Sequence, residues 1–325
     1  MISKNITVSK NNIISKIKAS YRNYIVYIVF VILLLFFSFT LGGRGFFTLQ
    51  NLNNIIVQTA VISMLSVGLV FAFSAGMNDL SIGANLALSG LIAAYILRSG
   101  GGIFQAVSMA LGMGLVLGMT NGALVTWGNL PPWLATVGTQ TIIRGTAMFI
   151  MDSDYGVEIS NETFLKIFAQ GTVLGVPAIF IWTVAVVTFG YLLLYKHKFG
   201  ARVLATGGNE TSAKYSGINT HKIKIMCMIL CGVLASTAGV INAARLSSAR
   251  YTVGDGIESS VIAAVVLGGT SMNGGKGNIF GALVGSLLIG MINAGLIIGG
   301  LTSSQQLIVR GTIIIVALLL GEKDK

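Results

Sequence analysis

Few side chains in this sequence of 325 residues have the types and spacing that bond-breaking chemistry requires. Cys227 and Cys231 lie four residues apart within an apolar stretch, which is more typical of cysteines in a membrane helix than of a metal site or a disulfide. The chain has two histidines and no HExxH pattern, so zinc has no ligand set. Because nucleophile motifs are also missing, we predict no catalytic residue, no metal and no enzyme activity in this chain.

One glycine-rich run, GGTSMNGGKG at 268–277, has the composition of a phosphate-binding loop but not its spacing. The GxxxxGK[ST] pattern needs glycine at 270 and serine or threonine at 277, where this sequence has Thr270 and Gly277. We therefore predict no nucleotide site or other cofactor here. If the function is driven by ATP, then ATP and Mg²⁺ must bind to another chain.

A short polar segment, 207–217, has the signals of a helix with defined ends. Gly207 and Gly208 are expected to break the chain, Asn209 is a good N-cap, and Gly217 is a typical helix stop. The predicted helix at 210–216 presents Glu210 and Lys214, together with Tyr215. Two interpretations remain open, a solvated connector and a helix onto which a partner docks.

The elements that would position these residues follow from the composition. Hydrophobic residues make up 54% of the chain and charged residues only 10%, with a mean hydropathy of +0.83. Too few polar side chains remain to cover a soluble protein of this size. A soluble enzyme and a nucleic-acid-binding domain are both excluded, although the net charge is +11.

Apolar runs long enough to cross a bilayer recur along the sequence, which predicts an all-α, polytopic membrane protein with about ten transmembrane helices. The first run, at 24–42, has no charged residue at all. The candidate segments are 24–42, 53–75, 80–97, 103–126, 131–151, 172–195, 223–246, 257–272, 278–298 and 304–321.

The charges predict which side of the bilayer each loop occupies. With ten spans, 14 of the 21 basic residues fall on one side, which the positive-inside rule makes cytoplasmic. Six of the ten acidic residues, including Asp152, Asp154 and Glu158, fall on the other side. We therefore predict a cytoplasmic arm at 1–23, cytoplasmic termini, and one membrane domain at 24–325 with a cytoplasmic loop at 196–222.

Three pairs of segments repeat in the same order along the chain. GMTNGALV at 118–125 is similar to GMINAGLI at 290–297, IRGT at 143–146 to VRGT at 309–312, and DLSIGANLALSG at 79–90 to ESSVIAAVVLGG at 258–269. Each pair is separated by five predicted spans, an odd number, so the second copy would lie inverted in the membrane. Two inverted-topology halves are typical of transporters, and chance similarity in a glycine-rich chain is the alternative. The rare arginines of the repeat, Arg144 and Arg310, are expected to pair or to reach the interface.

Polar side chains in or beside the apolar runs are candidates for a translocation pathway or its gate. For Asp79 we favour a structural role, as a cap that holds the start of the next helix. Asn121 and Asn293 are equally suited to form contacts between helices. The candidates are Asp79, Ser81, Asn85, Asn121, Thr136, Thr270 and Asn293.

Five motifs in order give the chain a specific resemblance to a known family. They are DLSIG at 79–83, NLPPWLATVGT at 129–139, GGNE through SGIN at 207–219, AAVVLGGTS at 263–271 and GGKG at 274–277. Over about 55–320 the chain resembles the permease subunits of sugar-importing ATP-binding cassette transporters, in the ribose/xylose/galactose permease family.

The resemblance implies a permease in the bacterial inner membrane that carries a monosaccharide or a similar hydroxylated solute. Its implied partners are a second identical or homologous permease, a cytoplasmic ATPase that binds ATP and Mg²⁺, an extracytoplasmic sugar-binding protein and the lipid bilayer, but no nucleic acid. Residues matching the coupling region to the ATPase would be Gly207, Gly208, Asn209, Glu210, Lys214, Ser216 and Gly217.

The inverted repeat alone would also fit a self-sufficient, ion-coupled secondary transporter. Such a transporter needs buried acids to bind its coupling ions, and the predicted spans offer only Asp79 and Glu258, both at span ends. The ATP-driven permease is therefore the main prediction. The identity of the solute lies beyond this sequence, because in such importers the binding protein does most of the selecting.

Overall fold

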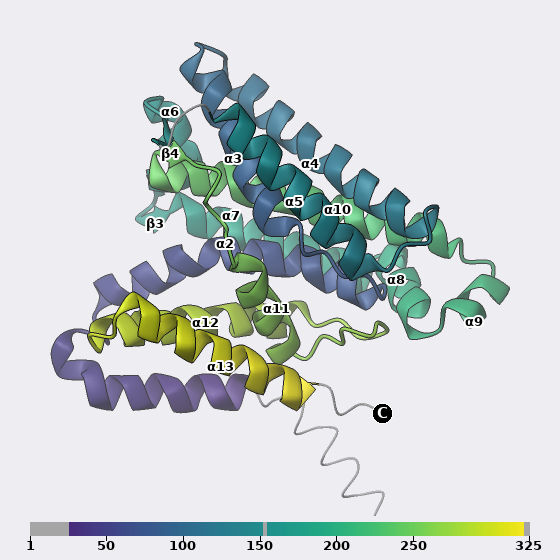
Figure 1. Ribbon diagram of the computed structural model, residues 1–325. Helices are drawn as coiled ribbons and strands as arrows, with labels where there is room; N and C mark the ends of the chain where they lie inside the picture. Colours follow the sequence, from purple (N-terminus) through teal and green to yellow (C-terminus); the bar gives the residue numbers. More distant parts are fainter. Residues whose placement is uncertain (1–25, 152–154, 322–325) are drawn as a thin grey trace, which may run out of the picture.

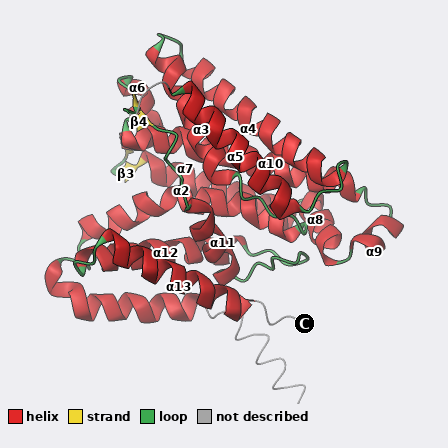
Figure 2. Cartoon of the chain, in the orientation of Figure 1, coloured by secondary structure: helices red, strands yellow, loops and turns green. Residues whose placement is uncertain are grey.

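The computed structural model describes residues 26–151 and 155–321, and these residues are mostly helical (Figure 2). The predicted arm at 1–23 lies outside the described residues, as do Asp152 and Asp154 of the acidic loop between the candidate segments 131–151 and 172–195. The strands within the described residues are only two residues long each and form two small antiparallel pairs.

The first half of the chain opens with a helix at residues 26–41, which continues into the 3-10 turn η1 (Gly42–Arg44). The following elements are α2 (Leu49–Ser74), α3 (Ile82–Arg98), α4 (Ile103–Thr126), α5 (Pro132–Ile150), β1 (Val157–Glu158), α6 (Glu162–Leu165), the π-helical turn η2 (Lys166–Gln170), β2 (Thr172–Val173) and β3 (Val176–Pro177).

The second half begins with α7 (Ala178–Tyr191), which runs into a second π-helical turn, η3 (Leu192–Lys196). The remaining elements are α8 (Lys198–Gly208), α9 (Glu210–Tyr215), α10 (Thr220–Leu246), β4 (Ser248–Ala249), α11 (Ile257–Leu267), α12 (Ile279–Ile298) and α13 (Ser303–Gly321).

Six helices among the described residues are long and apolar enough to cross a membrane: Val26–Arg44, α2, α4, the continuous Ala178–Lys196, α10 and α12. The other four predicted segments also contain helices, namely α3, α5, α11 and α13. Two boundaries were wrong. Residues 172–177 form a β2–β3 hairpin because Leu174 and Gly175 both have positive φ, and α11 ends at Leu267 because Gly269 (φ 87°) turns the chain.

The long helix α10 separates two polar ends of the molecule. Its 27 residues span about 40 Å at 1.5 Å per residue, which is close to the thickness of a whole bilayer. The short helices α8 and α9 lie at its start, whereas β4 follows its end and pairs with β1 (Figure 1). The loop at 196–222, which is rich in lysine, and the acidic loop are therefore at opposite ends of α10.

Small residues allow α4 to lie directly against α10. Buried residues recur every four positions along it, at Ala106, Ala110, Gly114, Gly118, Gly122 and Thr126, and Asn121 is buried as well. A Cβ added at Gly118 would lie 2.4 Å from the carbonyl oxygen of Met228, and one at Gly232 would lie 2.2 Å from that of Gly114. Glycine therefore lets the two helix backbones pack closely at this contact.

Candidate functional site

The candidate coupling segment is a short helix, α9, that projects from the rest of the protein (Figure 1). Asn209 caps it, because its side-chain oxygen accepts a hydrogen bond from the Ser212 N–H at 2.9 Å. At the other end Gly217 has φ 81°, and the amides of Gly217 and Ile218 donate to the carbonyls of Lys214 and Ala213. Both predicted ends of this helix are confirmed, and the Tyr215 side chain is 90% exposed.

Gly207 and Gly208 differ from expectation, because they do not break the chain. They are the last two residues of α8, a helix that sequence reasoning missed, and the direction changes only at Asn209 (φ −156°). The signal that was available is Val203 and Thr206, three residues apart and both buried with Phe199 on one face of α8. Three glycines in eleven residues masked this periodicity.

Glu210 fastens α9 to the start of α10. Its carboxylate pairs with Lys214 at 3.0 Å and with Lys224 at 2.6 Å, and it accepts a hydrogen bond from the Thr220 hydroxyl at 3.0 Å. Partial burial alone would raise the pKa of Glu210, but hydrogen bonds from Lys224 and Lys214 outweigh it and lower the pKa to about 2. Glu210 is therefore ionised at physiological pH and holds α9 in place.

The depressed pKa predicts how α9 responds to acid. Stability from the Glu210 contacts is present above the ordinary carboxyl pKa of 4.5 and is lost as the pH falls from there toward 2. Amide hydrogen exchange in α9, corrected for its intrinsic pH dependence, should therefore accelerate between pH 5 and pH 3. Glu210→Gln should exchange faster at pH 5 and lack this step; an equal step in that variant would contradict the assignment.

Asp79, Ser81 and Asn121 form a buried chain of hydrogen bonds at the start of α3. The Asp79 carboxylate accepts from the Ser81 amide at 2.9 Å and from the Ser81 hydroxyl at 2.6 Å. The Asn121 amide of α4 donates to the same hydroxyl at 2.8 Å. Asp79 thus holds the residue that precedes α3, a local turn of the kind that aspartate favours.

Asn85 and Thr136 extend this buried polar group to α10 and α5. Asn85 donates to the Gly232 carbonyl at 2.9 Å, and Ser89 and Ser236 both donate to the Asn85 oxygen. Thr136 accepts from the Leu80 amide at 3.2 Å. Five of the seven predicted pathway residues therefore lie together, each at most 2% exposed, and they join α3, α4, α5 and α10. Gly232 is the thirteenth of the 27 residues of α10, so the group lies against the middle of this helix.

The other two predicted pathway residues lie elsewhere. Thr270 is buried in the loop between α11 and α12, where its hydroxyl accepts from the Asn278 amide at 3.0 Å. Asn293 is half-buried on α12. The assignment of all seven residues to a translocation pathway stays a prediction.

Two polar side chains of α5, whose partners sequence reasoning did not identify, bind the start of α11 and the segment before it. Arg144 forms an ion pair with Asp255 at 2.7 Å and donates to the carbonyls of Tyr251 and Val253. Gln140 donates to Glu258 at 3.3 Å. The expectation that Arg144 pairs is confirmed, whereas the side chain of Arg310 lies outside the described residues. Arg144 and Gln140 lie one helical turn apart on α5, the only signal that the sequence offered.

Comparison with known proteins gives consistent results over most of the chain. The family model for the branched-chain amino acid transport system permease component matches residues 51–318. The ribose import permease of Escherichia coli (strain K12) is 40% identical over 284 residues, 86% of this chain and 88% of the relative. The D-allose transport system permease of the same strain is 38% identical (90% and 89%), and the L-arabinose ABC transporter permease of Azospirillum brasilense is 32% identical (91% and 86%). No solved structure matches the chain.

Proposed function

Because the chain belongs to the family of branched-chain amino acid transport system permease components, we propose that it is the permease subunit of an ATP-driven importer. Its solute is a monosaccharide or a similar small hydroxylated molecule, since the relatives with 32–40% identity are named for ribose, allose and arabinose. The observation that carries the proposal is the capped, exposed helix α9, which sits at the opposite end of α10 from the acidic loop.

We further propose that all ten predicted segments cross the bacterial inner membrane, with both termini in the cytoplasm, as two inverted halves. The packing of the helices supports this arrangement. In the first half α3 packs on α4 and α5, and in the second α11 packs on α12 and α13. Across the halves α4 packs on α10 just as α12 packs on α2. This exchange of equivalent partners is expected of two repeats related by a pseudo-two-fold axis.

The partners follow from the two polar ends of the molecule. At the cytoplasmic end, α9 and its flanking residues Gly207, Gly208, Ser216 and Gly217 would couple to an ATPase that binds ATP and Mg²⁺. At the other end, the acidic segment around β1 and α6 would receive a sugar-binding protein, and a second permease would complete the pathway. The chain itself would catalyse no reaction. It would change between outward-open and inward-open states, because its contacts with the ATPase differ between the two states.

The ion-coupled alternative receives less support. Its candidate ion ligands are Asp79, which is engaged with Ser81, and Glu258, which accepts from Gln140. A relative that matches 91% of this chain is named an ABC transporter permease. ATP drive through a separate subunit is therefore the function that this chain supports best.

Co-purification tests the proposal directly. The chain, tagged at its C-terminus and extracted from its native membranes in mild detergent, should bring down an ATP-binding cassette ATPase in equimolar amount. Recovery of a pure permease that still accumulates sugar in vesicles energised only by an ion gradient would contradict ATP coupling and support the alternative.

A further inference from the structure

Three segments from distant parts of the sequence meet at the cytoplasmic end with almost no side chain between their backbones. They are the end of α2 at Ser74, the end of α8 at Gly207 and Gly208, and the loop 268–278 between α11 and α12. A Cβ added at Gly207 would lie 2.0 Å from the Ser74 carbonyl oxygen and 2.8 Å from the Gly275 nitrogen. Only glycine at 207 permits this approach.

The loop contributes its own glycines to the same contact. A Cβ at Gly274 would lie 2.4 Å from the Gly207 carbonyl oxygen, and one at Gly275 would lie 2.8 Å from the Gly208 Cα. Both loop glycines have positive φ, 92° and 77°, which other residues adopt at a cost. The Gly275 amide donates to the Ser74 carbonyl at 3.0 Å, so the loop is also hydrogen-bonded to the end of α2.

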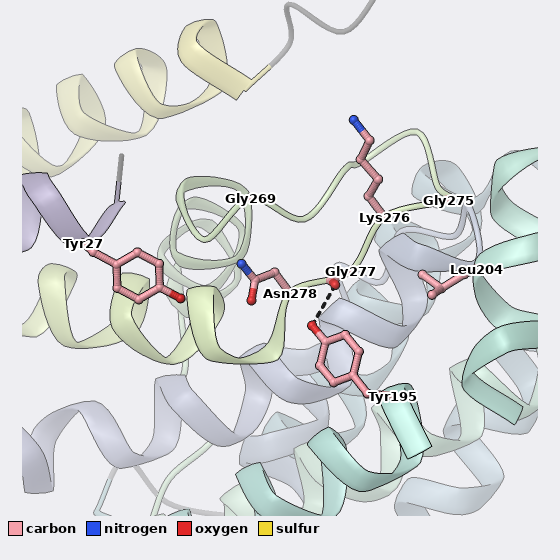
Figure 3. A pocket seen from close by; sticks show the side chains of 8 residues that line it. All are labelled: Tyr27, Tyr195, Leu204, Gly269, Gly275, Lys276, Gly277 and Asn278. Carbon is pink, nitrogen blue, oxygen red and sulfur yellow. Dashed lines mark hydrogen bonds between the residues drawn. The ribbon is translucent and has the colours of Figure 1, made fainter. Parts of the chain in front are cut away.

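Gly277 and Tyr195 complete the contact on the side of α12. A Cβ at Gly277 would lie 2.3 Å from the Ser74 hydroxyl oxygen. The Tyr195 hydroxyl donates to the Gly277 carbonyl at 3.0 Å and accepts from the amide of Ile279, the first residue of α12 (Figure 3). Gly275, Gly277 and Tyr195 line a cavity of about 580 Å³ whose opposite wall includes Tyr27 (Figure 3). Among the residues that the structure describes, the glycine contact therefore has packed backbone on one side and a cavity on the other.

We propose that Ser74, Gly207, Gly274, Gly275 and Gly277 form a joint that carries the displacement of α8 and α9 into both halves of the permease. The proposal rests on the proposed function. Backbones in direct contact leave no flexible side chain to absorb a shift, so movement at the end of α8 must displace α2 in one half and the loop before α12 in the other. The space toward Tyr27 gives the loop room to move. These five are positioning residues that touch neither ATP nor solute.

The GGKG motif at 274–277 thereby acquires a role that its nucleotide-loop composition does not suggest. Gly274, Gly275 and Gly277 are the three glycines of this motif, and each is held in place by α2 or α8. Gly208, in contrast, has room for a Cβ, whose nearest neighbour would be the Gly275 Cα at 3.7 Å. Because Gly208 belongs to the proposed coupling region, the control for substitutions within the joint is Gly112→Ala instead, at an exposed glycine of α4 with no atom within 4 Å of an added Cβ.

Hydrogen exchange of the unmutated complex is the first test. The native complex, purified through a tag on this chain, is compared without nucleotide and with ATP plus orthovanadate. Peptides that cover α9, the end of α2 and 268–278 should change protection together. A change in α9 that leaves both other segments unaffected would overturn the joint, and this outcome needs no variant to fold.

Paired variants in proteoliposomes provide the second test. Uptake of radiolabelled ribose, allose and arabinose is first measured with the wild type, and the sugar that the wild type imports fastest is then used for the variants. Gly277→Ala should lower the solute imported per ATP hydrolysed by about tenfold or more, because misplacements near 1 Å cost activity on this scale. Ser74→Ala, which keeps the backbone carbonyl of the joint, and the control Gly112→Ala should stay near the wild-type ratio. The double variant Gly277→Ala/Ser74→Ala removes the hydroxyl that clashes and should restore most of the ratio.

The outcomes separate the joint from the proposed function. A wild-type complex without ATP-driven uptake refutes the proposed function and the joint with it. Uptake by the wild type together with an unchanged ratio in Gly277→Ala refutes the joint alone. A lowered ratio that Ser74→Ala fails to rescue also refutes it, because the loss would then not pass through the Ser74 contact.

Discussion

Glu210→Lys is expected to abolish most solute uptake while the chain still inserts into the membrane at normal levels. The substitution replaces a carboxylate that binds two ammonium groups, at 3.0 Å and 2.6 Å, with a third ammonium group. Like charges repel at this spacing, so α9 loses its attachment to the start of α10. We expect uptake to fall at least about tenfold, as for other misplacements of a functional element by about 1 Å.

Two further variants show whether the ion pair itself is responsible. Glu210→Lys combined with Lys224→Glu exchanges the two charges and should recover a substantial part of the uptake. Lys198→Glu reverses a charge in the same loop, at the exposed first residue of α8, and should leave uptake close to wild type. Normal uptake in Glu210→Lys would refute the coupling role of α9.

Gly118→Val has the second large expected effect, on stability rather than on coupling. The new side chain meets the backbone of α10, since even a Cβ would lie 2.4 Å from the Met228 carbonyl oxygen and 2.7 Å from the Ile229 Cα. Backbone contacts relieve such a clash only by moving the helices apart, and overpacking typically costs about 1–3 kcal/mol. The purified permease should melt several degrees lower and accumulate less in membranes.

Gly112→Val is the matched control on the same helix. Gly112 is exposed and has no atom within 4 Å of an added Cβ, so the same change in helix propensity occurs there without the clash. A loss of thermal stability in Gly112→Val equal to that in Gly118→Val would show that the α4–α10 contact does not have the stated role.

Local signals in the sequence were sufficient where the structure depends on neighbours along the chain. The N-cap at Asn209 and the stop at Gly217 gave the bounds of α9, and Pro131 and Pro132 marked the start of α5 because proline disfavours helix in the residue before it. Long apolar runs located the membrane helices for the same reason. Where α2, α4, α10 and α12 each lie along the sequence depends only on the hydrophobic composition of that one segment.

Contacts between distant segments could not be predicted in this way. Nothing around Gly207 indicates that Ser74 and Gly275 would meet it, so the glycine was taken as a break rather than a contact. Asn121 and Asn85 were recognised as polar residues in apolar helices, but their partners Ser81 and Gly232 lie on other helices. Asp255 could not be recognised as the partner of Arg144, because pairing across about 110 residues depends on how α5 packs against the segment before α11.

Solute uptake into proteoliposomes that contain the purified complex tests the central claim most directly. With binding protein and sugar on one side and ATP with Mg²⁺ on the other, uptake should require ATP hydrolysis and should persist when ion gradients are collapsed with ionophores. Uptake that continues without ATP and stops when the gradients collapse would contradict the account.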